Sequence, residues 1–145
     1  MRIAHDALVM VVDGGKMLLF RNAGDEEFPD LKVEEAVEQV NPADREQSTD
    51  RPGRASATVG TRSAMEETDF HQQAEDRFAV ETADLLNRRA LAGDFDQLVI
   101  VAPPTTLGEM RKHYHKTLQD RLAGEIPKTL TGHPVDEIEQ IIIRS

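Results

Sequence analysis

The sequence contains no cysteine and no tryptophan, and its other aromatic residues are five phenylalanines and one tyrosine among 145 residues. Disulfide bonds, thiolate metal sites and cysteine nucleophiles are therefore excluded. No apolar run approaches the roughly 18 residues that a membrane-spanning helix needs. The apolar run Ala7–Val12 ends in Asp-Gly-Gly, without the cleavage site of a signal peptide. We therefore expect a cytoplasmic protein with no membrane contact.

Recognisable catalytic motifs are also missing. The sequence has no G-x-S-x-G, G-x-x-x-x-G-K-S/T or G-x-G-x-x-G motif. His113 and His115 are two residues apart, which places them on opposite sides of a helix and does not favour a metal site. A nuclease or other hydrolase would need Asp13, Glu66 and Glu67 to converge on metal ions. We therefore favour a protein without catalytic residues, cofactor or metal, and keep a hydrolase or nuclease as an alternative.

Positive charge is scarce. The chain has 17 lysines and arginines against 27 acidic residues, so its formal net charge is −10 and its pI is near 4.9. A charge of this sign repels nucleic acid and anionic membranes at long range. Binding to an anionic partner would therefore require local basic patches.

The N-terminal third predicts three strands. Ala7–Val12 is a short, β-branched, continuously apolar run, which indicates a buried strand. Asp13-Gly14-Gly15 predicts a turn, because glycine adopts positive φ without steric cost. Lys16–Asn22 completes a hairpin, and Leu31–Val40 predicts a third, half-exposed strand. The glutamates and alanines of this last run also allow a helix.

A long polar segment and a long helix are predicted next. Residues 41–64 are rich in Pro, Gly, Ser, Thr, Asp and Arg and predict an irregular loop. Thr68 or Asp69 is a suitable N-cap for a helix that runs to about Ala92, with Gly93 as its C-terminal stop. The predicted buried stripe of this helix consists of Phe70, Ala74, Phe78, Leu85, Leu86 and Ala90.

The C-terminal third alternates strands and helices. Gln97–Ala102 predicts a core strand of a parallel sheet. Thr106 and Glu109 form a predicted capping box for a helix that continues through Tyr114 as far as Leu122. Leu122–Ile126 predicts a short edge strand, because Pro127 is tolerated only at an edge. Pro134 suits the first position of a last helix.

This order predicts the fold class. A hairpin followed by βα units implies an α/β protein with a mixed β-sheet and helices on its faces. We expect residues 1–145 to form a single domain of this kind.

Several blocks of the sequence resemble the host-attachment protein family, which is described as required for attachment to host cells. They include DRPGR (Asp50–Arg54), VAPPTTLGEMR (Val101–Arg111) and EIPKTLTGHPVDEIE (Glu125–Glu139). That family is similar to the middle domain of eukaryotic-type class I release factors, a mixed-sheet domain with a ribonuclease-H-like layout. The resemblance implies a role near the ribosome or tRNA, and an indirect role in attachment.

The chemistry of release factors does not carry over with the resemblance. Those factors use a Gly-Gly-Gln loop to admit water to the peptidyl ester. Gly14-Gly15 is the one Gly-Gly pair of this sequence, and Lys16 follows it. The resemblance therefore implies binding rather than peptide release.

The arginine-rich segment (41–64) is the first candidate binding site. Its Arg45, Arg51, Arg54 and Arg62 outnumber three carboxylates, so its net charge is +1 and the rest of the chain carries −11. Arginine forks match phosphates bidentately, so the segment is a candidate RNA-backbone contact that orders on binding. Alternatively, it is a solvated or dimer-bridging loop whose arginines pair with the acidic body.

Two further basic groups are candidate anion-binding residues. The predicted helix after Gln97–Ala102 begins beyond the carboxyl end of a strand, where α/β sheets tend to bind ligands. The candidates on it are Thr105, Thr106, Arg111, Lys112, His115 and Lys116, and Lys128 and His133 would join the same face. Alternatively, the cations offset the helix dipole, and Thr131 or His133 caps the last helix.

These observations favour a non-catalytic binding protein that contacts the ribosome, structured RNA or another anionic partner. The alternative is a regulatory protein that acts through protein–protein contacts and affects attachment indirectly. A homodimer is one form that this alternative allows.

Overall fold

The computed structural model describes the backbone of residues 1–39 and 56–145 and the side chains of residues 1–39 and 69–145. Five strands form one sheet in the order β3-β2-β1-β4-β5. β1 (Leu8–Val12), β2 (Lys16–Asn22) and β3 (Leu31–Glu38) pair antiparallel. β4 (Leu98–Val101) pairs parallel with β1 and with β5 (Leu122–Ile126). The predicted mixed sheet is therefore confirmed.

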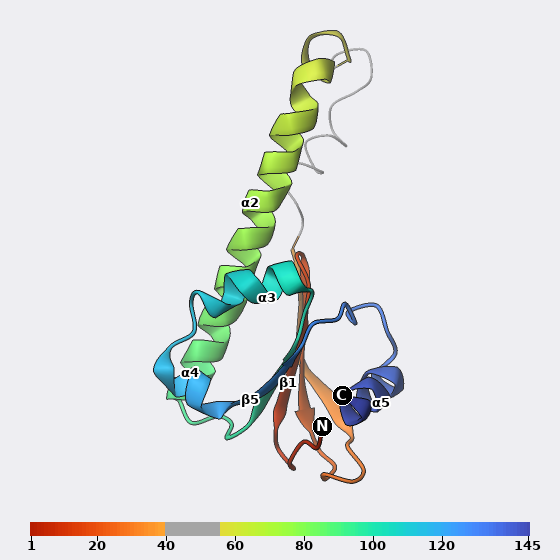
Figure 1. Cartoon of the computed structure of the whole chain (residues 1–145), viewed down its shortest axis with the longest axis vertical. Helices are drawn as coiled ribbons and strands as arrows, with labels where there is room; N and C mark the ends of the chain where they lie inside the picture. Colours follow the sequence, from red (N-terminus) through yellow and green to blue (C-terminus); the bar gives the residue numbers. More distant parts are fainter. Residues whose placement is uncertain (40–55) are drawn as a thin grey trace.

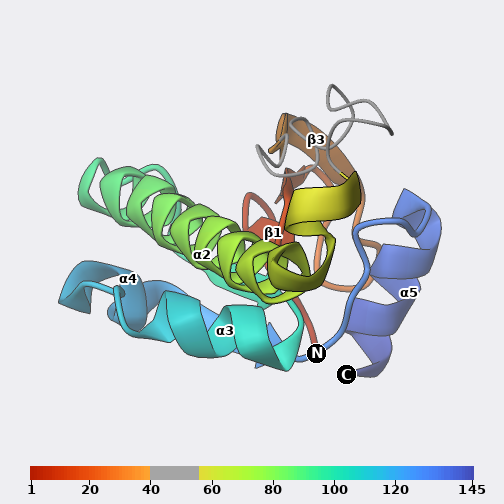
Figure 2. The same ribbon diagram turned by 90° about the horizontal axis from the view of Figure 1, so that it is seen from above.

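Helices cover both faces of the sheet. α2 (Ser56–Leu91), α3 (Pro104–Arg111) and α4 (Lys116–Arg121) lie on one face, and α5 (Val135–Arg144) lies on the other (Figures 1 and 2). No helix in the described part of the chain is both long and apolar enough to cross a bilayer.

The two faces bury two separate cores. Met10 and Leu19 point toward α2 and contact Phe78, Leu86 and their neighbours. Val9 and Val99 point the other way and contact Ile138 and Ile142 of α5. Every residue of β1 and β4 is buried, which explains why both sequences are continuously apolar rather than alternating.

The third strand is confirmed, and the helical alternative for this run is wrong. β3 forms the edge of the sheet, so its glutamates lie at the surface where charge is tolerated. The register shifts by one residue opposite Leu19 and Phe20, which is a β-bulge that leaves Glu34 without a partner residue on β2. The bulge places Glu34 and Glu35 where both contact Arg89 of α2.

α2 begins earlier than the sequence predicts. It starts at Ser56 rather than at Thr68 or Asp69, so residues 56–64 are helical and the predicted loop is wrong over that stretch. Figure 1 shows that this part of α2 extends beyond the sheet. A helical stretch with no sheet to cover needs no apolar stripe, which is the pattern by which a helix is predicted. Residues 41–55 of the predicted loop lie outside the described residues.

The rest of α2 largely follows the predicted stripe. Ala74, Phe78, Leu86 and Ala90 are buried and Leu85 is partly buried, but Phe70 is 37% exposed. Gly93 ends the helix as predicted, with a φ of +70° and hydrogen bonds from Gly93 N to Ala90 O and from Asp94 N to Arg89 O. These two bonds form a Schellman motif, which requires positive φ at this position.

The predicted helix after β4 is divided into two. α3 ends at Arg111 and α4 begins at Lys116. The buried side chain of Asn87, on α2, holds the connection: its amide donates to His113 O at 2.8 Å, and its carbonyl accepts from His115 N at 3.0 Å. The break depends on a partner from another helix, so the local sequence does not reveal it.

The turn between β1 and β2 differs from the prediction in its mechanism. Neither Gly14 nor Gly15 adopts positive φ. Instead, Asp13 Oδ1 accepts hydrogen bonds from Gly15 N and Lys16 N at 2.8 and 2.7 Å. A Cβ on Gly14 would lie 2.7 Å from Cδ of Glu75, so a larger residue at this position would displace the Glu75 side chain of α2.

Asn22 organises the loop between β2 and β3 from a fully buried position. Its amide nitrogen lies 3.2 Å from Ile3 O and 3.0 Å from Ala4 O. Its carbonyl oxygen accepts from Gly24 N and Asp30 N at 3.0 and 2.9 Å. One side chain therefore joins the N-terminal segment to both ends of the loop.

A charge network joins β2, β3 and the C-terminal end of α2. Arg21 contacts Glu34 at 2.7 Å and Asp94 at 3.0 Å. Arg89 contacts Glu34, Glu35 and Asp94 at 3.1, 3.1 and 2.8 Å. The hydrogen bond from Arg21 holds the pKa of the Glu34 carboxyl below its ordinary value.

The first prediction concerns the buried amide. Replacing Asn22→Asp removes both N–H donors and places a carboxylate against the carbonyls of Ile3 and Ala4, so we expect a loss of roughly 3 kcal/mol in unfolding free energy. Urea denaturation at pH 7 measures it. The matched control, Gln140→Glu at an exposed position on α5, should change stability by less than about 0.5 kcal/mol. Equal stabilities of the two variants would contradict the role of Asn22.

The second prediction concerns pH. Glu34 has a lowered pKa when folded, so its stabilisation is complete above the unfolded pKa of about 4.3 and is lost as the pH falls through the folded value. Glu34→Gln should lower stability by about 1 kcal/mol at pH 7, or about 2–4 °C in Tm, and the difference should disappear in acid. Glu38→Gln, on the same strand, is the control. A difference that persists below about pH 3 would rule out this linkage.

Candidate functional site

The carboxyl ends of β1, β4 and β5 meet at one edge of the sheet, where α/β proteins usually bind ligands. Asp13 follows β1 and α3 follows β4, while the segment 127–134 connects β5 to α5. Asp13 Oδ2 accepts a hydrogen bond from the buried Thr131 hydroxyl at 2.6 Å. This bond fastens the connection to the β1–β2 turn and so shapes the edge.

The N-terminus of α3 lies at this edge but is not capped as predicted. Pro103 is the N-cap, Pro104 is the first helical residue, and no side chain caps the helix. Thr106 is a buried residue inside the helix, so the predicted capping box is wrong. Proline fits the first helical position because the N–H that it lacks would be unpaired there. Thr105 is exposed at the same end.

Arg111 is held by a carboxylate rather than presented to a ligand. Its Nε and Nη2 both lie 2.9 Å from Glu125 Oε1, on β5. The hydrogen bond to Glu125 raises the pKa of Arg111. Burial, together with the Glu125 carboxylate, raises the pKa of Tyr114, whose hydroxyl donates to Glu125 Oε2 at 3.2 Å. These three side chains form a closed group that ties the end of α3 to the sheet.

Lys112 and Lys116 also face acids. Lys112 Nζ lies 2.9 Å from Glu109 Oε2, and this hydrogen bond lowers the pKa of Glu109 and raises that of Lys112. Lys116 Nζ lies 2.9 Å from Asp120 Oδ1. The break between α3 and α4 separates the two basic rows that a continuous helix would have placed side by side. The His115 side chain is exposed.

Lys128 is exposed and makes no ion pair with any residue that the structure describes. It follows β5 beside Ala102, since Ala102 N donates to Ile126 O at 3.1 Å. Lys112 lies at the far end of α3, about 12 Å along the helix axis from its start. Lys112 pairs with Glu109 and Lys128 follows β5, and no hydrogen bond or ion pair links the two side chains in the described part of the chain.

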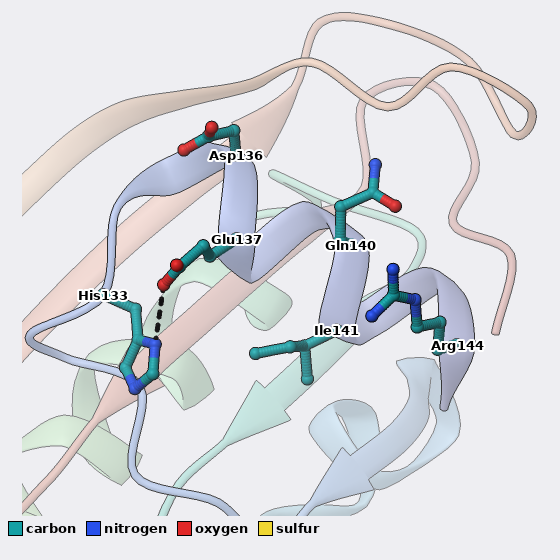
Figure 3. A pocket seen from close by; sticks show the side chains of 6 residues that line it. All are labelled: His133, Asp136, Glu137, Gln140, Ile141 and Arg144. Atoms are coloured by element: carbon teal, nitrogen blue, oxygen red, sulfur yellow. Dashed lines mark hydrogen bonds and ion pairs between the residues drawn. The ribbon is translucent and has the colours of Figure 1, made fainter.

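His133 belongs to a different surface, a cavity of about 510 Å³ along α5. Figure 3 shows the six side chains that line it, all from α5 and the residue pair before it: His133, Asp136, Glu137, Gln140, Ile141 and Arg144. His133 Nδ1 lies 3.0 Å from Glu137 Oε2. The N-cap of α5 is Pro134 with no side-chain cap, so neither Thr131 nor His133 caps this helix.

The arginine-rich segment is mostly outside the described residues. Arg45, Arg51 and Arg54 lie in the part of the chain that the structure does not describe. Arg62 lies in α2, but its side chain is not among those described. Their role as anion contacts stays a prediction.

A second cavity, of about 390 Å³, lies between the β1–β2 turn and α2. Its lining residues are Asp13, Gly14, Gly15, Gln39, His71, Ala74 and Glu75. The lining contains two carboxylates and no lysine or arginine among the residues described, so it does not suit a phosphate. The sequence reasoning missed Gln39 and Glu75, because only the docking of α2 against the turn brings them together. In the sequence, the Asp-Gly-Gly turn was the nearest indication of a cavity at this place.

Within 1–39 and 69–145, no three His, Asp or Glu side chains are grouped so that they could hold a metal ion. The side chains of Glu66 and Glu67, which the nuclease alternative requires, lie outside these ranges.

Comparison with known proteins identifies the relatives of the chain. Residues 6–142 match the family described as bacterial archaeo-eukaryotic release factor family 12. No curated protein matches the chain. Among solved structures, it is similar to an archaeal translation termination factor, aRF1, with 11% sequence identity and a TM-score of 0.47. The match covers 95% of this chain and 40% of that factor, so the chain spans less than half of its length.

The third prediction tests the bond that shapes the carboxyl edge. Thr131→Val removes the hydroxyl that donates to Asp13 and leaves Oδ2 without this partner, so we expect a loss of about 1–2 kcal/mol in unfolding free energy. Chemical denaturation of the variant measures it. Thr129→Val is the matched control, since Thr129 is exposed in the same segment, and its effect should stay within about 0.5 kcal/mol. If both variants behave alike, the Asp13–Thr131 bond does not stabilise the edge.

Proposed function

Because the chain belongs to the bacterial archaeo-eukaryotic release factor family 12, we propose that it is a non-catalytic protein that binds the ribosome or structured RNA. Family membership across residues 6–142 is the observation that carries this proposal. The mixed α/β fold agrees with the layout that the release-factor resemblance implies. The sequence has no Gly-Gly-Gln, so the proposal is binding and not hydrolysis of peptidyl-tRNA.

The arginine-rich segment is the proposed contact with phosphates. Arg111, Lys112 and Lys116 are held by Glu125, Glu109 and Asp120. Binding a phosphate at these positions would require an existing ion pair to open. Arg45, Arg51 and Arg54 lie in the segment 41–64, which carries a net charge of +1 within an acidic chain. Lys128, which has no ion pair among the described residues, is the proposed additional contact at the carboxyl edge.

A second candidate is a regulatory protein, with a homodimer as one possible form, that affects attachment to host cells indirectly. The acidic body of the chain favours it, because a net charge of −10 suits protein partners better than nucleic acid. A cytoplasmic location is part of both proposals. Recovery of RNA or ribosomal proteins alone in a pull-down would count against this candidate.

The fourth prediction tests ribosome binding. The purified chain should co-sediment with bacterial ribosomes at about 50 mM salt and largely dissociate at about 200 mM, because phosphate contacts release counterions. The triple variant Arg45→Gln, Arg51→Gln, Arg54→Gln should bind at least roughly 10-fold more weakly and show a shallower salt dependence. Titration of the chain against ribosomes in sedimentation assays measures both effects.

The matched control changes the same number of charges elsewhere. Arg77, Arg88 and Arg144 are exposed and have no ion pair among the described residues. Their combined replacement by glutamine should leave binding within about two-fold, since charges away from the contact act only by weak long-range attraction. An equal loss in both triple variants, or co-sedimentation that is insensitive to salt, would contradict the proposal.

A further inference from the structure

The loop between β2 and β3, residues 23–30, presents an aromatic side chain to solvent. Phe28 is 75% exposed, the largest value for any large apolar side chain among the described residues. Phe20, Phe78 and Phe95 are by contrast almost fully buried. An isolated apolar residue at the surface is common, so exposure alone does not assign a role to Phe28. The loop around it supplies the further observations.

The β2–β3 loop holds Phe28 in a fixed position. Asp25 Oδ1 accepts hydrogen bonds from Glu27 N at 3.0 Å and from Phe28 N at 2.8 Å. Asp25 N donates to Phe28 O at 3.2 Å, which closes the turn from the other side. Both the N–H and the carbonyl of Phe28 are therefore hydrogen-bonded within the loop, without any partner.

The base of the same loop is equally constrained. Ala23 N donates to Asp30 O at 2.8 Å, and the buried Asn22 side chain binds Gly24 N and Asp30 N. A Cβ on Gly24 would lie 2.1 Å from Phe28 O, so the chain doubles back closely enough to require glycine. A preordered loop loses little conformational entropy when it binds, which is the property of an efficient binding anchor.

The loop that carries Phe28 is acidic, and His5 Nδ1 lies 2.7 Å from its Gly24 O. Asp25, Glu26, Glu27 and Asp30 are exposed, and the loop contains no lysine or arginine. Lys32 lies 3.5 Å from Asp30 and offsets one of these charges. The resulting negative field repels RNA and anionic lipid and attracts a positively charged surface.

We propose that the β2–β3 loop is the docking site for a basic protein, which takes the Phe28 ring into an apolar pocket bordered by lysine or arginine side chains. An aromatic anchor at the centre with charges around it is the usual arrangement of an interface hot spot and its rim. A second copy of this chain, with its net charge of −10, would be repelled by the acidic loop at long range.

The β2–β3 loop shares no residue with the proposed RNA contact. Figure 1 shows the β2–β3 loop at the end of the sheet opposite to the projecting part of α2. The loop precedes β3, whereas the arginine-rich segment comes after it, and the eight residues of β3 span roughly 25 Å. The proposal therefore goes beyond the proposed function, and either one can fail alone.

Crosslinking in cells tests the partner class. Phe28→p-benzoylphenylalanine in the full chain should crosslink on irradiation to a basic protein, identified by mass spectrometry, with a pI above about 9. The same replacement of Leu91, which is 68% exposed on α2, should not yield this product. A crosslink only to RNA, to an acidic protein or to a second copy of the chain would overturn the proposal, as would no crosslink or equal yields at both positions.

Affinity measurements with the purified crosslinked protein complete the test. Phe28→Ala should bind roughly 30-fold more weakly with unchanged Tm, because the ring contributes little to folding while exposed. Glu26→Gln with Glu27→Gln should weaken binding several-fold and flatten its salt dependence. The matched pair Glu81→Gln with Asp84→Asn, exposed on α2, should not. Unchanged affinity in the Phe28 variant would refute the anchor, even if ribosome binding through the arginine-rich segment were confirmed.

Discussion

The burial of β1 on both faces is the constraint on which the rest of the structure depends. Each of its five residues is inaccessible to solvent, and the strand is paired on both edges, antiparallel with β2 and parallel with β4. Apolar side chains that point in both directions need helices on both faces, which α2, α3 and α4 supply on one side and α5 on the other. Parallel pairing also brings the carboxyl ends of β1, β4 and β5 to one edge. There, Asp13 accepts a hydrogen bond from the hydroxyl of Thr131.

Polar side chains then determine how the connections lie on this core. Asn22 and Asn87 are buried amides that satisfy backbone groups of a loop and of a helix break. Arg21 and Arg89 both form ion pairs with Glu34 of β3 and with Asp94, which follows α2. Every buried side-chain polar atom in the described residues has a hydrogen-bond partner. These groups therefore fix the positions of the connections without the free-energy penalty of an unsatisfied polar atom. The two proposed contacts flank β3 in the sequence: the acidic loop around Phe28 precedes it, and the arginine-rich segment follows it.

Local sequence patterns predicted the strands well and the helices less well. Leu8–Val12 and Leu98–Val101 are apolar throughout because both faces are covered, and Gly93 marks a helix end because its positive φ is a backbone requirement. Three errors share another cause. The break before α4 and the burial of Thr106 depend on contacts with residues distant in the sequence. The start of α2 depends on the lack of a packing surface. None of these can be read from a window of neighbouring residues. For the candidate site, the sequence predicted that cations follow β4 and β5, but not which of them have acidic partners.

The amino-acid sequence by itself determined the absence of thiol chemistry and of a Gly-Gly-Gln loop, the acidic net charge, the mixed order of strands and helices, and the positions of its arginines. These are properties of composition and of short-range order, which the chain possesses before it folds. The tertiary structure decided that Arg111 is neutralised by Glu125, that Glu75 approaches Gly14, and that Phe28 stands exposed on a loop fastened by Asn22. Such outcomes require residues distant in sequence to meet, since burial and ion pairing are properties of the packed surface and not of the residues alone.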